Sequence, residues 1–455
     1  MAVNTNWQKP IKLGSGAYGT VFSNKKDEAV KISLMDSWDK VQSSLREFHS
    51  LAQLDYATKE KHRKDGNLKV KEPLRFVELR KIRYGKCKMH LFMNRADGNL
   101  SCLDSRDLSA DTIEKFAIQL FQGLFTMRNH KMFHRDIKPE NILIDLKTST
   151  LSFCDFGLSR HLHDDTEYGT GYIVTRWYRA PELLTHQRDK VQKKNQLAQL
   201  QYTEKMDVYS VGVILYELIF DSHLAPGKTI DESLEILKRR IGRLTVERLL
   251  KHPKVTEKVA KALVGCLAIE PKERFTCART LFKLGKLSAD QMVEYQEDKG
   301  KHVTLKYAPI QPERDRYDNE AWDKRSDIFT DVYKRFSNQK RVIAYALVIY
   351  DHVNHWSAYD FPVHQRFSFS IIYASLVIGS YYTSDKLMKY AKEKCWGKEK
   401  KNKAVRDLIC KWTGVLYYKR NYFVDVSMWE SGKFNTFNEF MKEALQNPYR
   451  LKRKR

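Results

Sequence analysis

Residues 134–141 of this chain read His-Arg-Asp-Ile-Lys-Pro-Glu-Asn, and Asp-Phe-Gly follows at residues 155–157. The first stretch holds a carboxylate, a lysine and an asparagine, and the second adds another carboxylate before a glycine. Transfer of a phosphoryl group from a metal-bound nucleotide needs a group that orients the attacking hydroxyl and two oxygen ligands for Mg²⁺. The two stretches therefore supply the side chains that phosphoryl transfer requires.

These stretches resemble the catalytic loop and the metal-binding loop of eukaryotic protein kinases. The resemblance implies that Asp136 accepts or orients the proton of the substrate hydroxyl, while Lys138 offsets charge on the transferring phosphoryl group. It also implies that ATP is the nucleotide and that Asn141 and Asp155 hold Mg²⁺.

Three upstream motifs lie in the order that this resemblance requires. Residues 14–21 (Gly-Ser-Gly-Ala-Tyr-Gly-Thr-Val) are similar to the glycine-rich hairpin over the phosphates, where the backbone must approach the oxygens closely. Lys31 matches the strand lysine that meets the α and β phosphates, and Glu47, in an apolar-periodic helical pattern, is its candidate partner. The expected cofactor-binding residues are Gly14, Gly16, Gly19, Val21, Lys31, Glu47, Met93 and Ala96. Met93 would be the gatekeeper of the ATP pocket, and residues 94–96 its hinge.

The downstream motifs extend the resemblance to residues 7 to about 285. Glu182 ends an Ala-Pro-Glu motif, and Arg274 matches the arginine that pairs with this glutamate. Asp207 opens an apolar run, as in the kinase helix whose aspartate braces the catalytic loop. Two alternatives are a weakly active scaffold and a nucleic-acid-binding protein with a vestigial kinase fold. The intact catalytic set counts against both.

The segment before Glu182 indicates the kinase group. Residues 174–182 (Val-Thr-Arg-Trp-Tyr-Arg-Ala-Pro-Glu) resemble the cyclin-dependent and mitogen-activated kinases, and Thr170 and Tyr172 match the dual phosphorylation site of the latter. The plainer interpretation is that both are ordinary polar loop residues. By resemblance, phosphorylated Thr170 would be bound through charge-assisted hydrogen bonds by three arginines. These are Arg46, Arg135 and Arg160.

The same resemblance implies the substrate. Arg179 matches an arginine that makes proline preferred just after the phosphorylated residue, and Lys138 favours Ser/Thr over Tyr chemistry. We therefore expect protein substrates with Ser/Thr-Pro sites. The polar run 185–196 is either a solvated insertion or a docking site for an acidic substrate.

The remaining third of the chain indicates a helical domain. The expected organisation is an α+β, bilobal kinase fold over residues 1–288, a linker over 289–324 and an all-α domain over 325–455. Apolar-periodic segments at 328–336, 342–356, 367–382, 404–416 and 434–445 predict its helices. Residues 342–352 and 369–380 faintly resemble two helices of a cyclin box, and an unrelated helical bundle is the alternative. Tethered at an effective concentration of order millimolar, this domain could act in cis on the Glu47 helix.

Composition bounds the partners and the compartment. The net charge of +25 and the isoelectric point near 9.5 imply attraction to acidic partners, nucleic acid included, although a solvated basic face is the plainer explanation. Seven scattered cysteines without metal-ligand spacing suit the reducing cytoplasm or nucleus. We recognise no signal peptide and no apolar run of membrane-spanning length, so no membrane association is expected.

Overall fold

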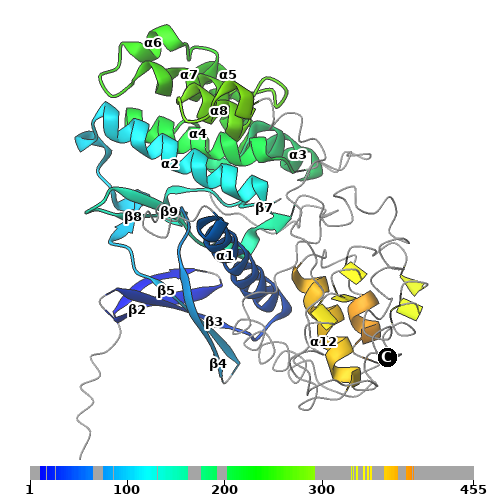
Figure 1. Ribbon diagram of the computed structural model, residues 1–455. Coiled ribbons are helices and arrows are strands. Elements are labelled where there is room, and N and C mark those ends of the chain that lie inside the picture. The colour runs from blue at the N-terminus through cyan, green and yellow to red at the C-terminus, as the bar shows by residue number, and fades with distance from the viewer. Residues whose placement is uncertain are drawn as a thin grey trace, which may run out of the picture. The chain divides into compact units, whose positions relative to one another are not determined.

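The computed structural model describes residues 11–64, 75–161, 176–191 and 202–292, apart from 17, 26, 86 and 131. Further on it describes residues 363–377, 386–391 and 393, with scattered positions between 329 and 350. Contacts divide the chain into two compact units (Figure 1). The first unit comprises Met1–Tyr56, Leu79–Met93 and Asp298–Arg455, and the second comprises Ala57–Glu78 and Asn94–Glu297.

A five-stranded sheet forms the N-terminal part of the first unit, in the order β1-β2-β3-β5-β4. Its strands are β1 (Lys12–Gly16), β2 (Gly19–Lys25), β3 (Glu28–Leu34), β4 (Leu79–Gly85) and β5 (Lys88–Asn94). Strand β5 shows why this segment is extended: Met89, Leu91 and Met93 are buried and alternate with less buried residues. A period of two places these three side chains on one face of the sheet.

Helix α1 (Trp38–Lys64) follows β3. Val41, Leu45 and Phe48 are fully buried, at the spacing of three to four residues that places side chains on one face of a helix. This is the apolar face that the sequence predicts for the helix carrying Glu47.

The second unit is mainly helical. Its helices are α2 (Ala110–Asn129), α3 (Pro181–Val191), α4 (Glu204–Phe220), α5 (Ile230–Ile241), α6 (Val246–Leu250), α7 (Glu257–Cys266) and α8 (Cys277–Lys283). Its short strands are β6 (Gly98–Asn99), β7 (Met132–Phe133), β8 (Ile142–Asp145), β9 (Thr150–Phe153) and β10 (Arg160–His161), which pair in the orders β6-β8-β9 and β10-β7. Helix α4 is buried around most of its circumference and packs against α2, which explains its nearly continuous apolar sequence. The predicted α+β fold class is confirmed.

The C-terminal third contributes one bounded helix, α12 (Val363–Val377), whose residues from Arg366 to Val377 are all buried. Residues 329–335 and 342–350 also contain helical positions. The predicted helices at 404–416 and 434–445 lie outside the described residues, as does most of the predicted linker. The domain boundaries and the likeness to a cyclin box stay predictions.

Helix α3 extends to Val191, so the first half of the polar run 185–196 is helical. Among the described residues, no helix has the length and apolar character needed to cross a membrane.

Candidate active site

The glycine-rich stretch forms the hairpin of β1 and β2, closed where Gly16 pairs with Gly19. A Cβ added at Gly19 would lie 2.8 Å from both the Ile32 carbonyl oxygen and the Ser33 hydroxyl, so only glycine fits there. At Gly14 and Gly16 a Cβ would meet no atom of the described residues within 4 Å. The latter two glycines are therefore not required by packing, which suits a backbone that a ligand approaches closely.

Three of the expected cofactor-binding residues lie in one row across β1, β2 and β3. Gly14 pairs with Val21, and Val21 pairs with Lys31. Directly opposite residues of antiparallel strands present their side chains on the same face. Val21 and Lys31 therefore share a face of the sheet.

Lys31 forms an ion pair with Glu47 of α1, as expected from the sequence. Its Nζ lies 2.7 Å from Glu47 Oε2 and 2.9 Å from Oε1. The exposed fractions of the two side chains are 9% and 3%. A pair this buried fixes the lysine relative to the helix, because either charge alone would lack solvation.

The predicted hinge coincides with the division of the chain into units, which falls between Met93 and Asn94. The Met93 side chain is buried, whereas Ala96 is half-buried. Asn94 Oδ1 accepts a hydrogen bond of 2.6 Å from the Glu78 amide. The asparagine thus anchors the start of this segment within the second unit.

The residues of the 134–141 stretch converge on Asp136. Lys138 Nζ lies 2.8 Å from Asp136 Oδ2, and Asn141 Nδ2 lies 2.9 Å from the same oxygen. Asn141 Nδ2 also donates to the Asp136 carbonyl oxygen at 2.8 Å. The carboxylate is therefore held in one orientation by two donors.

Asp207, near the start of α4, stabilises the loop of residues 134–141 through hydrogen bonds. Its carboxylate accepts hydrogen bonds from the amides of His134 and Arg135 at 2.8 and 3.1 Å, and from the Tyr202 hydroxyl at 2.7 Å. Burial raises the pKa of Asp207, and the donors oppose this effect. Arg135 has a positive φ of 70°, a conformation of a non-glycine residue that the hydrogen bonds to Asp207 help to hold.

Tyr202 is a contributor that the sequence analysis missed. Besides its bond to Asp207, its ring lies 5.4 Å from the Arg135 guanidinium carbon and 5.3 Å from the Phe133 ring. No local sequence pattern around residue 202 predicts these contacts, because they depend on how α4 packs against the catalytic loop.

Asp155 also has a left-handed backbone, with φ 62° and ψ 67°. The following Phe156 is fully buried, with its ring 4.8 Å from that of His134 and 6.1 Å from that of Phe76. This aromatic packing fixes the chain immediately after Asp155 beside the catalytic loop.

The oxygen ligands expected for Mg²⁺ suit that ion. Asn141 uses its amide nitrogen toward Asp136, which leaves its amide oxygen as the atom for a cation. Asp155 supplies a carboxylate, and Mg²⁺ prefers oxygen ligands of these two kinds. The residues present therefore fit a magnesium-bound nucleotide.

The end of the segment after Asp155 is anchored in the second unit. Arg274, whose side chain is fully buried, donates to both carboxylate oxygens of Glu182 at 2.7 and 2.9 Å, the pairing expected from the sequence. Arg179 Nη1 donates to Gln187 Oε1 of α3 at 2.8 Å. Tyr178 donates to Glu217 Oε2 of α4 at 2.7 Å.

The predicted phosphate cluster is described only in part. Thr170 and Tyr172 lie outside the described residues, and so does the side chain of Arg160, whose backbone is in β10. Arg46 is buried, with an exposed fraction of 5%, and Arg135 is half-buried. The phosphorylation sites and their arginines stay predictions.

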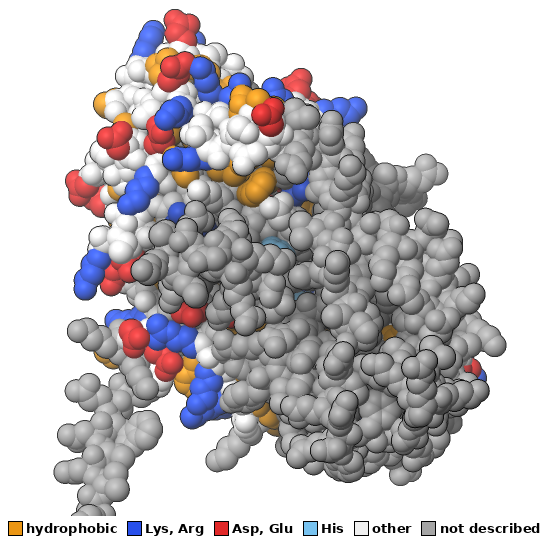
Figure 2. Space-filling view, in the orientation of Figure 1, with side chains coloured by type: hydrophobic (Ala, Val, Ile, Leu, Met, Phe, Trp, Pro, Cys, Tyr) orange, Lys and Arg blue, Asp and Glu red, His pale blue; other side chains and the backbone are white. Residues whose placement is uncertain are grey.

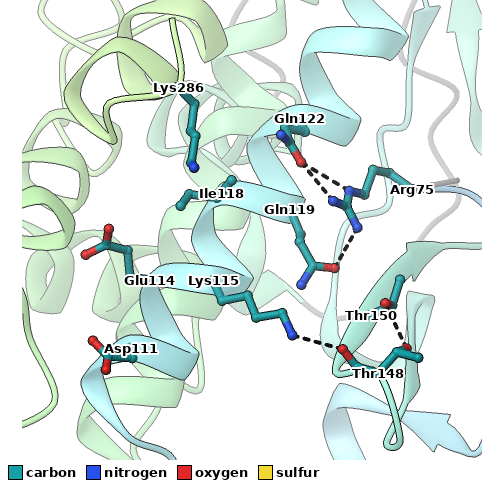
Figure 3. Close-up of a pocket in the computed structure, with 10 residues that line it drawn as sticks. All are labelled: Arg75, Asp111, Glu114, Lys115, Ile118, Gln119, Gln122, Thr148, Thr150 and Lys286. Atoms are coloured by element: carbon teal, nitrogen blue, oxygen red, sulfur yellow. Dashed lines mark hydrogen bonds between the residues drawn. The ribbon is translucent and has the colours of Figure 1, made fainter. Parts of the chain in front are cut away.

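A cavity of about 570 Å³ lies elsewhere in the second unit, beside α2 and the turn between β8 and β9 (Figure 3). Its polar groups bond with one another: Arg75 donates to Gln119 and Gln122, and Lys115 donates to the Thr148 carbonyl oxygen. None of the predicted active-site residues that the structure describes lines it.

The charge of the described surface is mixed. Figure 2 shows Lys and Arg side chains interspersed with Asp and Glu over the described part of one face. The net charge of +25 is therefore not gathered into one basic field on that part of the face. Binding of nucleic acid or of acidic partners stays a prediction.

Comparison with known proteins agrees with this geometry. The family described as "Protein kinase domain" matches residues 7–283. Cyclin-dependent kinase-like 4 of Mus musculus is 31% identical, over 60% of this chain and 81% of its own length. A mitogen-activated protein kinase of Fusarium vanettenii is 28% identical, over 72% of this chain and 88% of its own length. Mitogen-activated protein kinase 13 of Arabidopsis thaliana is 29% identical, over 53% of this chain and 62% of its own length.

Proposed function

The chain belongs to the protein kinase family, and from that premise we propose that it is a proline-directed Ser/Thr protein kinase. The observation that carries the proposal is the setting of Asp136, whose carboxylate lies within 2.9 Å of Lys138 and Asn141 donors. A carboxylate held in this way is prepared to receive a proton at a fixed point.

The proposed mechanism assigns each group one task. Bound MgATP supplies the phosphoryl group. Asp136 orients the substrate hydroxyl and accepts its proton, and Lys138 offsets negative charge beside it. Asn141 and Asp155 would hold Mg²⁺, while Lys31, fixed by Glu47, would bind the α and β phosphates. The backbone of the glycine-rich hairpin would cover the phosphates, with Val21, Met93 and Ala96 at the nucleotide.

The finer substrate class rests on resemblance. Two of the relatives carry the names cyclin-dependent kinase-like and mitogen-activated protein kinase, and the Thr-Arg-Trp-Tyr-Arg run ending at Arg179 is similar to that group. Lys138 supports transfer to Ser or Thr. The contact of Arg179 with Gln187 supports a fixed loop where the residue after the phosphorylated one would bind.

Regulation is the second part of the proposal. Phosphorylation of Thr170, with Tyr172 as a second site, would order the segment through Arg46, Arg135 and Arg160. The C-terminal helical region would act in cis on the same chain. The seven scattered cysteines of the sequence, which lack metal-ligand spacing, support a reducing compartment, cytoplasm or nucleus.

A set of matched peptides tests the proposal. The full chain should phosphorylate a Ser-Pro peptide with a kcat/KM about tenfold or more above that for the Ser-Ala peptide, a difference of about 1.4 kcal/mol in transition-state binding. A Thr-Pro peptide should be accepted and a Tyr-Pro peptide should not. Asp136→Asn serves as the inactive control. Equal kcat/KM values for the Ser-Pro and Ser-Ala peptides would refute the proposed preference for proline. Phosphotyrosine as the main product would refute the proposed Ser/Thr specificity.

A further inference from the structure

Helix α1 carries a second stripe of side chains that is polar and yet buried. Gln42, Arg46, His49 and Gln53 follow one another at spacings of four, three and four residues, which places them on one face of the helix. Their exposed fractions are 8%, 5%, 4% and 7%. A polar stripe on a helix beside a sheet is normally the face that water covers.

The apolar stripe of α1 is buried as well, at Val41, Leu45 and Phe48. A single sheet can cover only one side of α1. The polar side must therefore be covered by another segment of the same chain. Buried polar side chains nearly always have hydrogen-bond partners. The partner of this stripe is therefore informative.

At Gln42 that partner is the C-terminal region. Gln42 Nε2 donates a buried hydrogen bond of 3.2 Å to the carbonyl oxygen of Leu376, 334 residues away. Leu376 is the second-last residue of α12 as the structure describes it (Val363–Val377). This hydrogen bond joins a side chain of α1 to the backbone of α12. Both residues belong to the first compact unit.

We propose that α12 is a built-in partner of α1, and that Gln42 is the positioning residue through which it holds that helix. Glu47 lies on α1 little more than one turn from Gln42, so a helix held at Gln42 keeps Glu47 on Lys31. The polar face of α1 is then occupied by the chain's own C-terminal region, and the kinase needs no separate protein there. This inference rests on the proposed kinase function for its link to catalysis.

The matched variants are Gln42→Met and Gln53→Met in the full chain. Both replace a buried glutamine of α1 by an apolar side chain of similar length, but the amide oxygen of Gln53 has no hydrogen-bond partner among the described residues. Two quantities are measured: hydrogen–deuterium exchange in residues 38–56 and 363–377, and the steady-state constants on a phosphorylatable peptide. Gln42→Asn, one methylene shorter, is a milder variant should Gln42→Met fold poorly.

Gln42→Met should speed exchange in both segments and lower kcat by about three- to tenfold, the range for one lost buried hydrogen bond, with the peptide KM unchanged. Gln53→Met should leave both within about twofold of the parent. Equal behaviour of the two variants would overturn the inference, and faster exchange with an unchanged kcat would overturn its link to catalysis. A parent chain that phosphorylates nothing would instead refute the proposed function, while the exchange data would still report on the α1–α12 contact.

Discussion

Breaking the Lys31–Glu47 pair from one side should destabilise the first unit as well as stop catalysis. The pair is bidentate, at 2.7 and 2.9 Å, and Glu47 keeps an exposed fraction of only 3%. Lys31→Met removes the cation and leaves the Glu47 carboxylate buried without it. Removing one partner of a buried ion pair costs about 3–5 kcal/mol, so we expect a loss of this size in the free energy of unfolding.

The double variant Lys31→Met/Glu47→Leu separates structure from chemistry. Replacing both members of a buried pair by apolar side chains is often neutral, so most of the lost stability should return. Phosphoryl transfer should not return, because Lys31 is still missing from the phosphates.

Urea unfolding measures the first effect, with amide exchange in β1, β2 and β3 used to follow the first unit on its own. Transfer of label from ATP to a peptide measures the second. A single variant that loses less than about 1 kcal/mol, or a double variant no more stable than the single one, would refute the reasoning on burial. A double variant with more than about a tenth of the parent rate would refute the role of Lys31.

Three further predictions concern the second unit. Asp155→Asn, which tolerates the left-handed backbone at φ 62°, should reduce the transfer rate by more than about tenfold in peptide assays, and a smaller loss would count against its role at Mg²⁺. Thr170→Ala should lower activity, and mass spectrometry should find phosphate on Thr170 of active protein; full activity without that phosphate would exclude the switch. Burial raises the pKa of Glu217 above its ordinary 4.5, so the folded chain retains a proton there that the unfolded chain has lost. The parent should therefore lose stability relative to Glu217→Gln as pH rises from about 4.5, and parallel curves of melting temperature against pH would contradict this.

Local motifs made much of the site predictable. The glycine-rich hairpin is closed by Gly16 and Gly19, and the register of β2 and β3 places Val21 opposite Lys31. These strands are neighbours in the sequence and are joined by short turns, so local motifs indicate their pairing. The setting of Asp136 is local as well, since Lys138 and Asn141 lie two and five residues away. Short separations let sequence spacing determine geometry.

Contacts between distant segments were not predictable. Tyr202 contacts Asp207 and Arg135 only because the start of α4 packs against the catalytic loop. Gln42 forms a hydrogen bond with Leu376, which is 334 residues away. Periodicity also misplaced one boundary: the apolar pattern predicts a helix from residue 367, whereas α12 begins at Val363. The first turn of α12 is mainly polar, and apolar periodicity cannot detect a helical turn that lacks apolar side chains.

The most direct test of the central claim is transfer of labelled phosphate from ATP to a Ser-Pro peptide by the full chain. The parent and Asp136→Asn should be compared with Mg²⁺ present and with Mg²⁺ removed by chelation. Asn141 and Asp155 are the expected Mg²⁺ ligands, so the parent should transfer phosphate only with Mg²⁺. Asp136 is held by Lys138 and Asn141 at a single carboxylate oxygen as the proton acceptor, so Asp136→Asn should lose that activity. Equal transfer by the two proteins, or transfer by the parent that is unaffected by chelation, would contradict the account.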